Sequence, residues 1–223
     1  MSGPPLAFAR FRGSQSDEWL MRIGRETAPA ILFVPPLFEE MNRTRALIAS
    51  VMRRLAKRGH GCWLIDLGGT GESERDLAEI GWDDWRHDVS LAAATIAEKA
   101  RKPLVASLRG GALVDSGAAA RGWWRFVPLD GAAVARDMAR SGLAGGVEWA
   151  GYAPCDALKS ALEAAAPAAV APLRIVRLAS DRGAADARVE GPALWRRSEP
   201  GNSAALADAI ANDLHRWSRE CVG

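Results

Sequence analysis

Short apolar runs that alternate with longer amphipathic segments limit this chain to few architectures. A continuous apolar run predicts a strand covered on both faces, whereas a half-exposed strand alternates apolar and polar residues. Residues 30–34 form such a continuous run, and further strands are expected at residues 62–65, 104–108, 124–128 and 173–178. Because the connections between these runs and the amphipathic segments are short, the sequence predicts a doubly wound, mostly parallel α/β sheet with helices on both faces.

Three further strands and a set of helices complete the expected fold. Leu6–Arg12 and Glu18–Ile23 flank a polar turn, which predicts an N-terminal hairpin, and Ala193–Trp195 is expected to begin the last strand. Helices are expected over 42–58, with Asn42 as N-cap, and over 82–100, 132–141, 157–166 and 204–219, and one more should follow residues 109–111 and end near 117–121. A chain of 223 residues suits one domain with a sizeable core, so we expect 1–223 to form a single domain.

The strand Leu104–Leu108 leads into a small-residue turn that has the outline of a nucleophile elbow. Such a turn holds one side chain at the sheet edge, and it needs small residues two positions before and after that side chain. A frame centred on Arg109 places Ser107 and Gly111 at those positions, which fits. A frame centred on Ser107 places Val105 and Arg109 there, which does not. The displayed residue is therefore Arg109, whose guanidinium stays protonated and cannot attack a carbonyl.

Ligands of a doubly wound sheet bind at the carboxyl ends of its strands. In this chain those ends carry Pro35–Glu40, Asp66–Ser73, Arg109-Gly110 and Asp181. The glycines at 68, 69 and 71 could suggest a phosphate loop, but the segment lacks the Gly-Lys-Ser/Thr ending and the dinucleotide spacing. A tight turn is the better interpretation of that segment, and no cofactor is expected.

Four motifs resemble one known group of proteins. Val34–Arg45, Asp66–Ser73, Trp82–Trp85 and Leu108–Ala112 are similar to the hydrolase-like proteins associated with exosortase A systems, which have the α/β-hydrolase fold. Those proteins accompany protein sorting and exopolysaccharide production in Gram-negative bacteria. The resemblance covers about residues 30–113 and implies an α/β-hydrolase-like fold with a reduced cap. It implies a reaction less securely, because the Leu-Arg pair at the elbow is typical of this group.

A Ser-His-Asp triad is disfavoured by the residues at its expected positions. The fold needs a nucleophile at the elbow, an acid after a late strand and a histidine after the last strand. Asp181 suits the acid, with Asp186 as an alternative, but the elbow carries Arg109 and the loop 198–203 has no histidine. The three histidines are better interpreted as surface or packing residues, and they are His60, His87 and His215. Ser107 is interpreted as a small residue that permits strand–helix contact.

The first of two functional hypotheses is an enzyme that hydrolyses an ester or thioester without a serine. Arg109 would bind an anionic group of the substrate, because a helix start and a guanidinium both favour anions. Glu39 or Glu40 would activate water, since crowding of two carboxylates favours proton uptake. Asp181 would orient a partner.

The second hypothesis is a catalytically inactive pseudo-hydrolase that binds an anionic ligand or a partner. In both hypotheses the ligand, a small acyl or anionic compound, would meet Arg109 and the loop around it, namely Leu37, Phe38, Asn42, Arg43 and Gly110. A third possibility is that Arg109 forms an internal ion pair with Glu39, Glu40 or Asp181 and only holds the loops together.

Composition excludes several classes of partner. The apolar fraction of 48%, the charged fraction of 25% and the net charge of +2 fit a soluble globular protein with no nucleic-acid partner. The sequence contains no run of about 18 apolar residues, so no membrane span is expected, and no signal peptide is evident. Cys62, Cys155 and Cys221 show neither a pairing pattern nor metal-ligand spacing, so we expect no metal and a reducing, cytoplasmic location.

Overall fold

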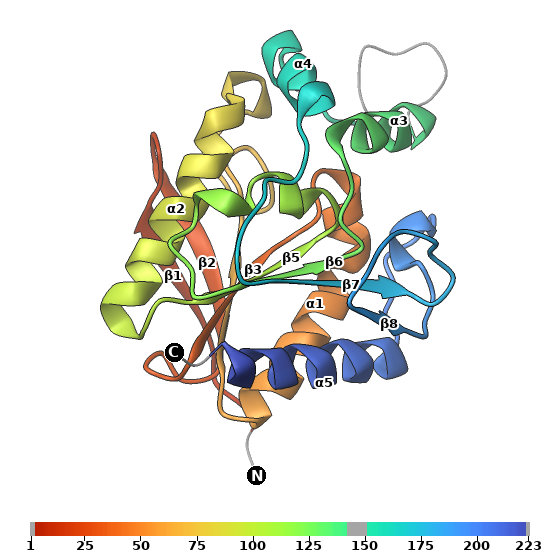
Figure 1. Ribbon diagram of the computed structural model, residues 1–223. Helices are drawn as coiled ribbons and strands as arrows, with labels where there is room; N and C mark the ends of the chain where they lie inside the picture. The colour runs from red at the N-terminus through yellow and green to blue at the C-terminus, as the bar shows by residue number, and fades with distance from the viewer. Residues whose placement is uncertain (1–2, 142–150, 222–223) are drawn as a thin grey trace.

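The computed structural model describes residues 3–141 and 151–221. Within this part, one sheet of eight strands has the order β1-β2-β4-β3-β5-β6-β7-β8 (Figure 1). The strands are β1 Leu6–Arg12, β2 Asp17–Ile23, β3 Ala30–Val34, β4 Gly61–Ile65, β5 Leu104–Leu108, β6 Trp123–Phe126, β7 Leu173–Leu178 and β8 Ala187–Val189. β1 pairs with β2, and β2 with β4, in antiparallel fashion, whereas the other neighbours are parallel. The predicted hairpin and the mostly parallel sheet are confirmed.

Helices cover both faces of this sheet. The α-helices are α1 Glu39–Lys57, α2 Trp82–Lys99, α3 Gly131–Ser141, α4 Asp156–Ala164 and α5 Ala204–Glu220. Figure 1 shows α1 and α5 on one side of the sheet and α2 on the other. Alternate residues of β3 serve two cores, since Ile31 and Phe33 pack with α1 and α5, and Leu32 and Val34 pack on the α2 side. A strand covered on both faces has to be apolar throughout, which confirms the doubly wound prediction.

The first helix begins earlier than the sequence suggested. α1 starts at Glu39, and the residue before it, Phe38, has a left-handed backbone with φ of +55°. Asn42 therefore lies one turn inside the helix and is not its N-cap. Its side-chain amide donates to Glu39 Oε2 at 3.2 Å and to Tyr152 Oη at 3.1 Å. The sharp turn at Phe38 lets the helix follow β3 almost at once, so Glu39 and Glu40 lie in the first helical turn and not in a loop.

Two other expected elements have a different form. Ala193–Trp195 is not a strand, because a 3₁₀ turn, η4 (Leu194–Arg196), occupies this position and β8 is the edge strand. Leu194 and Trp195 are apolar because they are buried against the α1 and α5 side of the core. The elbow is followed not by an α-helix but by two 3₁₀ segments, η2 (Arg109–Leu113) and η3 (Asp115–Gly117). The buried carboxylate of Asp115 anchors this segment to the sheet.

Two helices between β6 and β7 stand over the carboxyl ends of the strands. Figure 1 shows α3 and α4 together at the end of the sheet opposite the N-terminus. Gly131 at the start of α3 lies so close to α4 that a Cβ there would be 1.6 Å from the carbonyl oxygen of Leu162. This helical pair corresponds to the reduced cap that the resemblance implies, and α3 supplies one wall of the pocket described next.

Candidate functional site

The backbone at the end of β5 identifies the residue that the elbow displays. Arg109 has φ of +52°, a left-handed conformation that residues other than glycine rarely adopt. Two residues later, a Cβ on Gly111 would lie 2.4 Å from the carbonyl oxygen of Pro35, so only glycine fits there. Both observations match the elbow frame centred on Arg109. The strained turn and the close approach are both present, but the side chain at their centre is a guanidinium.

Acidic and aromatic groups surround the Arg109 guanidinium. Nε and Nη2 donate to the two Glu40 carboxylate oxygens at 3.0 and 2.8 Å, and Nη2 also donates to Asp137 Oδ2 at 3.3 Å. The guanidinium carbon lies 4.6 Å from the centre of a Trp195 ring, in cation–π geometry. The Arg109 side chain is only 4% exposed. The charge of Arg109 is thus already compensated, mainly by Glu40. Glu40 is one of the three acids that the internal ion-pair hypothesis named as possible partners.

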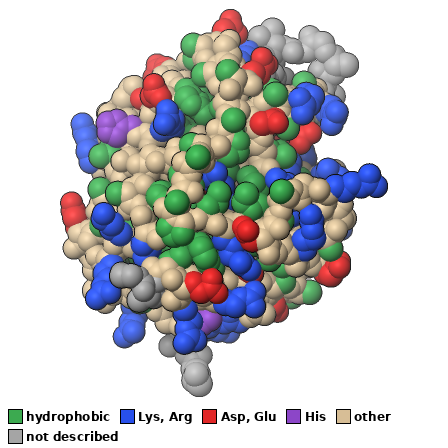
Figure 2. All heavy atoms as spheres, in the orientation of Figure 1, with side chains coloured by type: hydrophobic (Ala, Val, Ile, Leu, Met, Phe, Trp, Pro, Cys, Tyr) green, Lys and Arg blue, Asp and Glu red, His purple; other side chains and the backbone are tan. Residues whose placement is uncertain are grey.

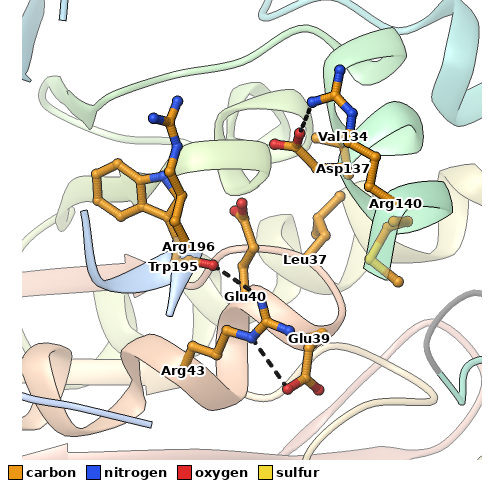
Figure 3. A pocket seen from close by; sticks show the side chains of 10 residues that line it. Leu37, Glu39, Glu40, Arg43, Val134, Asp137, Arg140, Trp195 and Arg196 are labelled. Carbon is orange, nitrogen blue, oxygen red and sulfur yellow. Dashed lines mark hydrogen bonds and ion pairs between the residues drawn. The ribbon is translucent and has the colours of Figure 1, made fainter. Parts of the chain in front are cut away.

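A cavity of about 440 Å³ lies beside this ion pair (Figure 3). Its apolar wall consists of Leu37, Val134, Met138 and Trp195. Its polar lining alternates in sign and consists of Glu39, Glu40, Arg43, Asp137, Arg140 and Arg196. Figure 3 shows the Glu40 side chain near the centre of this group, between Trp195 and Leu37. The pocket therefore offers an apolar surface with charged groups around it, as expected for a ligand with both kinds of surface.

Glu39 belongs to a separate, more exposed network. Its carboxylate lies 3.4 Å from Arg43 Nε, and its side chain is 27% exposed. Arg43 in turn donates from Nη1 to the Trp195 carbonyl oxygen at 3.1 Å, as the dashed line in Figure 3 marks. Asn42 links Glu39 to Tyr152. Negative side chains in a first helical turn are favourable, so both glutamates of α1 suit their positions without any ligand.

The other predicted contact residues lie close to the elbow in different roles. Phe38 is buried and packs edge-on against Trp85 and Tyr152, with ring centres 5.6 Å apart in both cases. Gly110 is also buried, and a Cβ on it would come within 3.2 Å of Leu37 and 3.1 Å of Val134. Neither Phe38 nor Gly110 belongs to the lining of the pocket, and neither offers a polar side chain to a ligand.

Ser107 is held in a buried network and is not displayed to the pocket. Its hydroxyl donates to Asp115 Oδ2 at 2.6 Å. The same carboxylate accepts from Arg125 Nε and Nη2 at 2.9 and 2.7 Å. All three residues are buried. Burial raises the Asp115 pKa despite these partners. The hydroxyl therefore stabilises a structural carboxylate, in agreement with the interpretation of Ser107 as a packing residue.

Asp181 lies away from the pocket lining. It follows β7 and accepts from Arg177 Nη1 at 3.0 Å and from the Gly183 backbone N–H at 2.9 Å. Burial acts to raise its pKa, but these two donors outweigh it and the pKa is lowered. Asp186, the alternative acid, accepts from the backbone N–H of Ile175. The counter-ions that the structure gives to Arg109 are Glu40 and Asp137, and Asp181 is not one of them.

No histidine lines the pocket within the described residues. His60 and His215 face each other at the opposite end of the sheet, with Nε2 and Nδ1 2.9 Å apart. Burial, and then the charge of His215, lowers the pKa of His60 to about 4. His87 is exposed on α2. In residues 3–141 and 151–221 no group of three metal-binding side chains converges, and no helix there is long and apolar enough to cross a bilayer.

Several pocket residues could not be found from the sequence. Asp137, Met138 and Arg140 line the pocket from α3. Nothing in their positions along the sequence indicates that this side of the helix meets the elbow. Trp195 was assigned to a strand, whereas its ring covers Arg109. One signal was available in the sequence: Asp137 is the acidic residue of α3, whose other residues are basic, small or apolar, and an isolated acid of this kind suggests a cation nearby.

The sequence is similar to that of a known group of proteins over part of its length. The chain is 32% identical over 134 residues to the bovine mitochondrial palmitoyl-protein thioesterase ABHD10, and 31% identical over the same length to the human protein. Each alignment covers 60% of this chain but 38% of the relative, so the chain spans under half the length of the curated relatives it matches. No protein-family model matches the sequence.

Solved structures decide the fold. The structure of mouse alpha/beta hydrolase domain-containing protein 10 aligns with 97% of this chain and 99% of its own chain, with a TM-score of 0.62 at 14% identity. The chain has an α/β-hydrolase fold. The acylaminoacyl peptidase of Pyrococcus horikoshii, with a TM-score of 0.52 over 79% of this chain and 32% of its own, has the same fold at 14% identity. Within the α/β-hydrolase fold, the elbow of this chain is the one that ends β5, with Arg109 at its tip.

Proposed function

We propose that this protein is a pseudo-hydrolase, which uses the pocket of an α/β-hydrolase fold to bind an amphipathic ligand without forming a covalent intermediate. The observation that carries the proposal is the buried Arg109 at the elbow, engaged by Glu40, Asp137 and Trp195. A guanidinium cannot act as nucleophile, and here it also fills the position where one would stand. The Ser107 hydroxyl is not an alternative, because it is committed to Asp115.

The lining of the pocket suggests the chemistry of the ligand. Leu37, Val134 and Met138 offer an apolar wall for a short acyl chain. The exposed Arg140 and Arg196 stand at the same pocket and supply positive charge for a carboxylate head group. Arg109 contributes little attraction of its own while Glu40 remains bound to it. We therefore place the acyl part against the apolar wall and the anionic head at the two exposed arginines.

Binding and hydrolysis measured side by side test this function. Calorimetric titration with a short-chain fatty acid should show saturable binding that weakens about tenfold in Arg140→Gln/Arg196→Gln. Arg53→Gln/Arg182→Gln is the matched control, because it removes two exposed arginines that do not line the pocket. A panel of activated acyl esters and thioesters should give no turnover above buffer. Turnover by the wild-type protein, or equal binding by all three proteins, would contradict the proposal.

A second candidate is hydrolysis of an ester or thioester by water that Glu39 activates. It is favoured by the exposure of Glu39 in the pocket and by the similarity to a palmitoyl-protein thioesterase, although that similarity covers only part of either chain. Glu40 is less suited, because its carboxylate is occupied by Arg109. Asp181 would then have only a supporting role. Acyl thioester turnover that survives Ser107→Ala and disappears in Glu39→Gln would establish this mechanism in place of simple binding.

We also propose that the protein acts in the cytoplasm, as one domain, beside an exosortase and exopolysaccharide system. The support is the set of motifs between residues 30 and 113, which includes the Leu108-Arg109 pair at the elbow that is typical of this group. Deletion of the gene in its host should alter exopolysaccharide output or protein sorting, and cell fractionation should recover the protein with the cytoplasmic fraction. Normal output and normal sorting in the deletion strain would remove the association.

A further inference from the structure

A second cavity, of about 310 Å³, lies at the opposite end of the sheet from the elbow. Its residues precede four neighbouring parallel strands or end α5. Ala28 and Pro29 lead into β3, His60 into β4, Lys102 into β5 and Arg121 into β6. β3 is five residues long, so about 13 Å of strand separates this cavity from the elbow end of the sheet. The two pockets are therefore distinct sites.

The charge of this cavity is one-sided. Among residues 3–141 and 151–221, four cationic side chains and no carboxylate line it; the cations are Arg101, Lys102, Arg121 and Arg219. In the described parts of the chain, no ion pair joins any of the four to an acid, whereas most arginines around the elbow have one. Figure 2 shows Lys and Arg side chains close together on the lower left of the molecule, where Figure 1 places the C-terminal end.

Arg121 is the most informative of the four, because it is half-buried. Its Nη1 donates to the carbonyl oxygens of Ser218 and Cys221 at 2.8 and 3.3 Å, at the C-terminal end of α5. These carbonyls carry only partial negative charge, so they do not neutralise the guanidinium. Burial lowers the pKa of Arg121, which reflects this incomplete compensation. A cation that is partly removed from water without a counter-ion favours the binding of an anion.

We propose that this cavity is a binding site for the phosphate or diphosphate group of a small metabolite. Four cations without an acid match a group with two or more negative charges better than a monocarboxylate, which would leave most of the charge uncompensated. Ala28, Pro29 and Cys221 form an apolar floor that accepts a small carbon skeleton next to the phosphate. The volume lies at the lower end of the range for small-molecule sites, so the ligand is compact.

Titration calorimetry with sodium diphosphate, in a low-salt buffer free of phosphate and sulfate, tests the proposal. The wild-type protein should bind with one-to-one stoichiometry. Arg101→Gln/Lys102→Gln, which changes two exposed side chains and should fold normally, should weaken binding about tenfold or more. Inorganic phosphate should compete, and butyrate should not.

Two variants separate this site from the elbow pocket and from general charge effects. Arg140→Gln/Arg196→Gln at the elbow pocket and Arg53→Gln/Arg182→Gln elsewhere on the surface should both keep the wild-type affinity for diphosphate. No saturable heat with the wild-type protein would overturn the proposal. Equal weakening in the control variants, or displacement of bound diphosphate by butyrate, would also overturn it.

Discussion

Replacement of Glu40 by glutamine should destabilise the protein, because it removes the main counter-ion of a buried arginine. Loss of one partner from a buried ion pair costs about 3–5 kcal/mol. The Arg109 side chain is 4% exposed and that of Glu40 is 14% exposed, so water can replace the lost charge only in part. Asp137 remains 3.3 Å from Nη2 and Trp195 remains against the guanidinium, which reduces the expected loss to about 2–3 kcal/mol. That loss is about 30- to 140-fold in the folding equilibrium.

Urea unfolding at neutral pH, followed by circular dichroism, measures this loss. Glu39→Gln is a matched control in the next position, since its partner Arg43 is 3.4 Å away and the pair is more exposed; it should cost less than about 1 kcal/mol. Arg109→Met/Glu40→Gln removes both charges and should be more stable than Glu40→Gln alone. The reasoning would be refuted if Glu40→Gln lost no more stability than Glu39→Gln, or if the double variant were less stable than Glu40→Gln.

Three further predictions concern residues near and far from the elbow. Gly111→Ala should cost about 3 kcal/mol in urea unfolding, because its methyl carbon would lie 2.4 Å from the Pro35 carbonyl oxygen; a loss below about 1 kcal/mol would be inconsistent with the tight elbow. Ser107→Ala should cost about 1–2 kcal/mol by removing a bond to Asp115 and should leave ligand binding unchanged, so altered binding would restore a functional role for the hydroxyl. His60 should titrate by NMR with a pKa of about 4, below its value of 6.5 in the unfolded chain. The unfolded state therefore takes up the proton first, and stability should fall by up to roughly 3 kcal/mol as pH drops from 6.5 through 4, a loss that His60→Gln should lack.

The sheet was predictable because burial leaves a direct trace in composition. The strands β3, β4 and β5 are each covered on both faces, so each is a continuous apolar run. The elbow was predictable for a different reason, namely that a tight strand-to-helix turn tolerates only small residues at fixed distances from its tip. Gly111 meets this requirement against Pro35, and the frame centred on Arg109 follows from it.

The partners of Arg109 were harder to predict, because the contacts join residues far apart in the sequence. Glu40 was one of three candidate acids, but sequence alone could not choose it over Asp181. Asp137 lies on α3, and its contact with Arg109 exists only because α3 packs over the elbow in the folded protein. Trp195 lies in a short apolar run that resembles a strand, yet it belongs to a 3₁₀ turn. The run is apolar because the turn packs into the core, and not because it is part of the sheet.

The geometry of the elbow and the identity of its residue have separate causes, and this separation bears on function. The left-handed backbone at position 109 and the approach of Gly111 to Pro35 are features of the strained turn itself and do not depend on the guanidinium. What arginine adds is a buried charge, which is tolerable only while Glu40 stays bound to it. With this pair intact, the pocket floor should attract anions weakly, and under the proposed function the exposed arginines would dominate recognition of the ligand. A ligand that displaced Glu40 would gain a third cation, the desolvated Arg109, so its binding should weaken less with added salt than binding at the two exposed arginines alone.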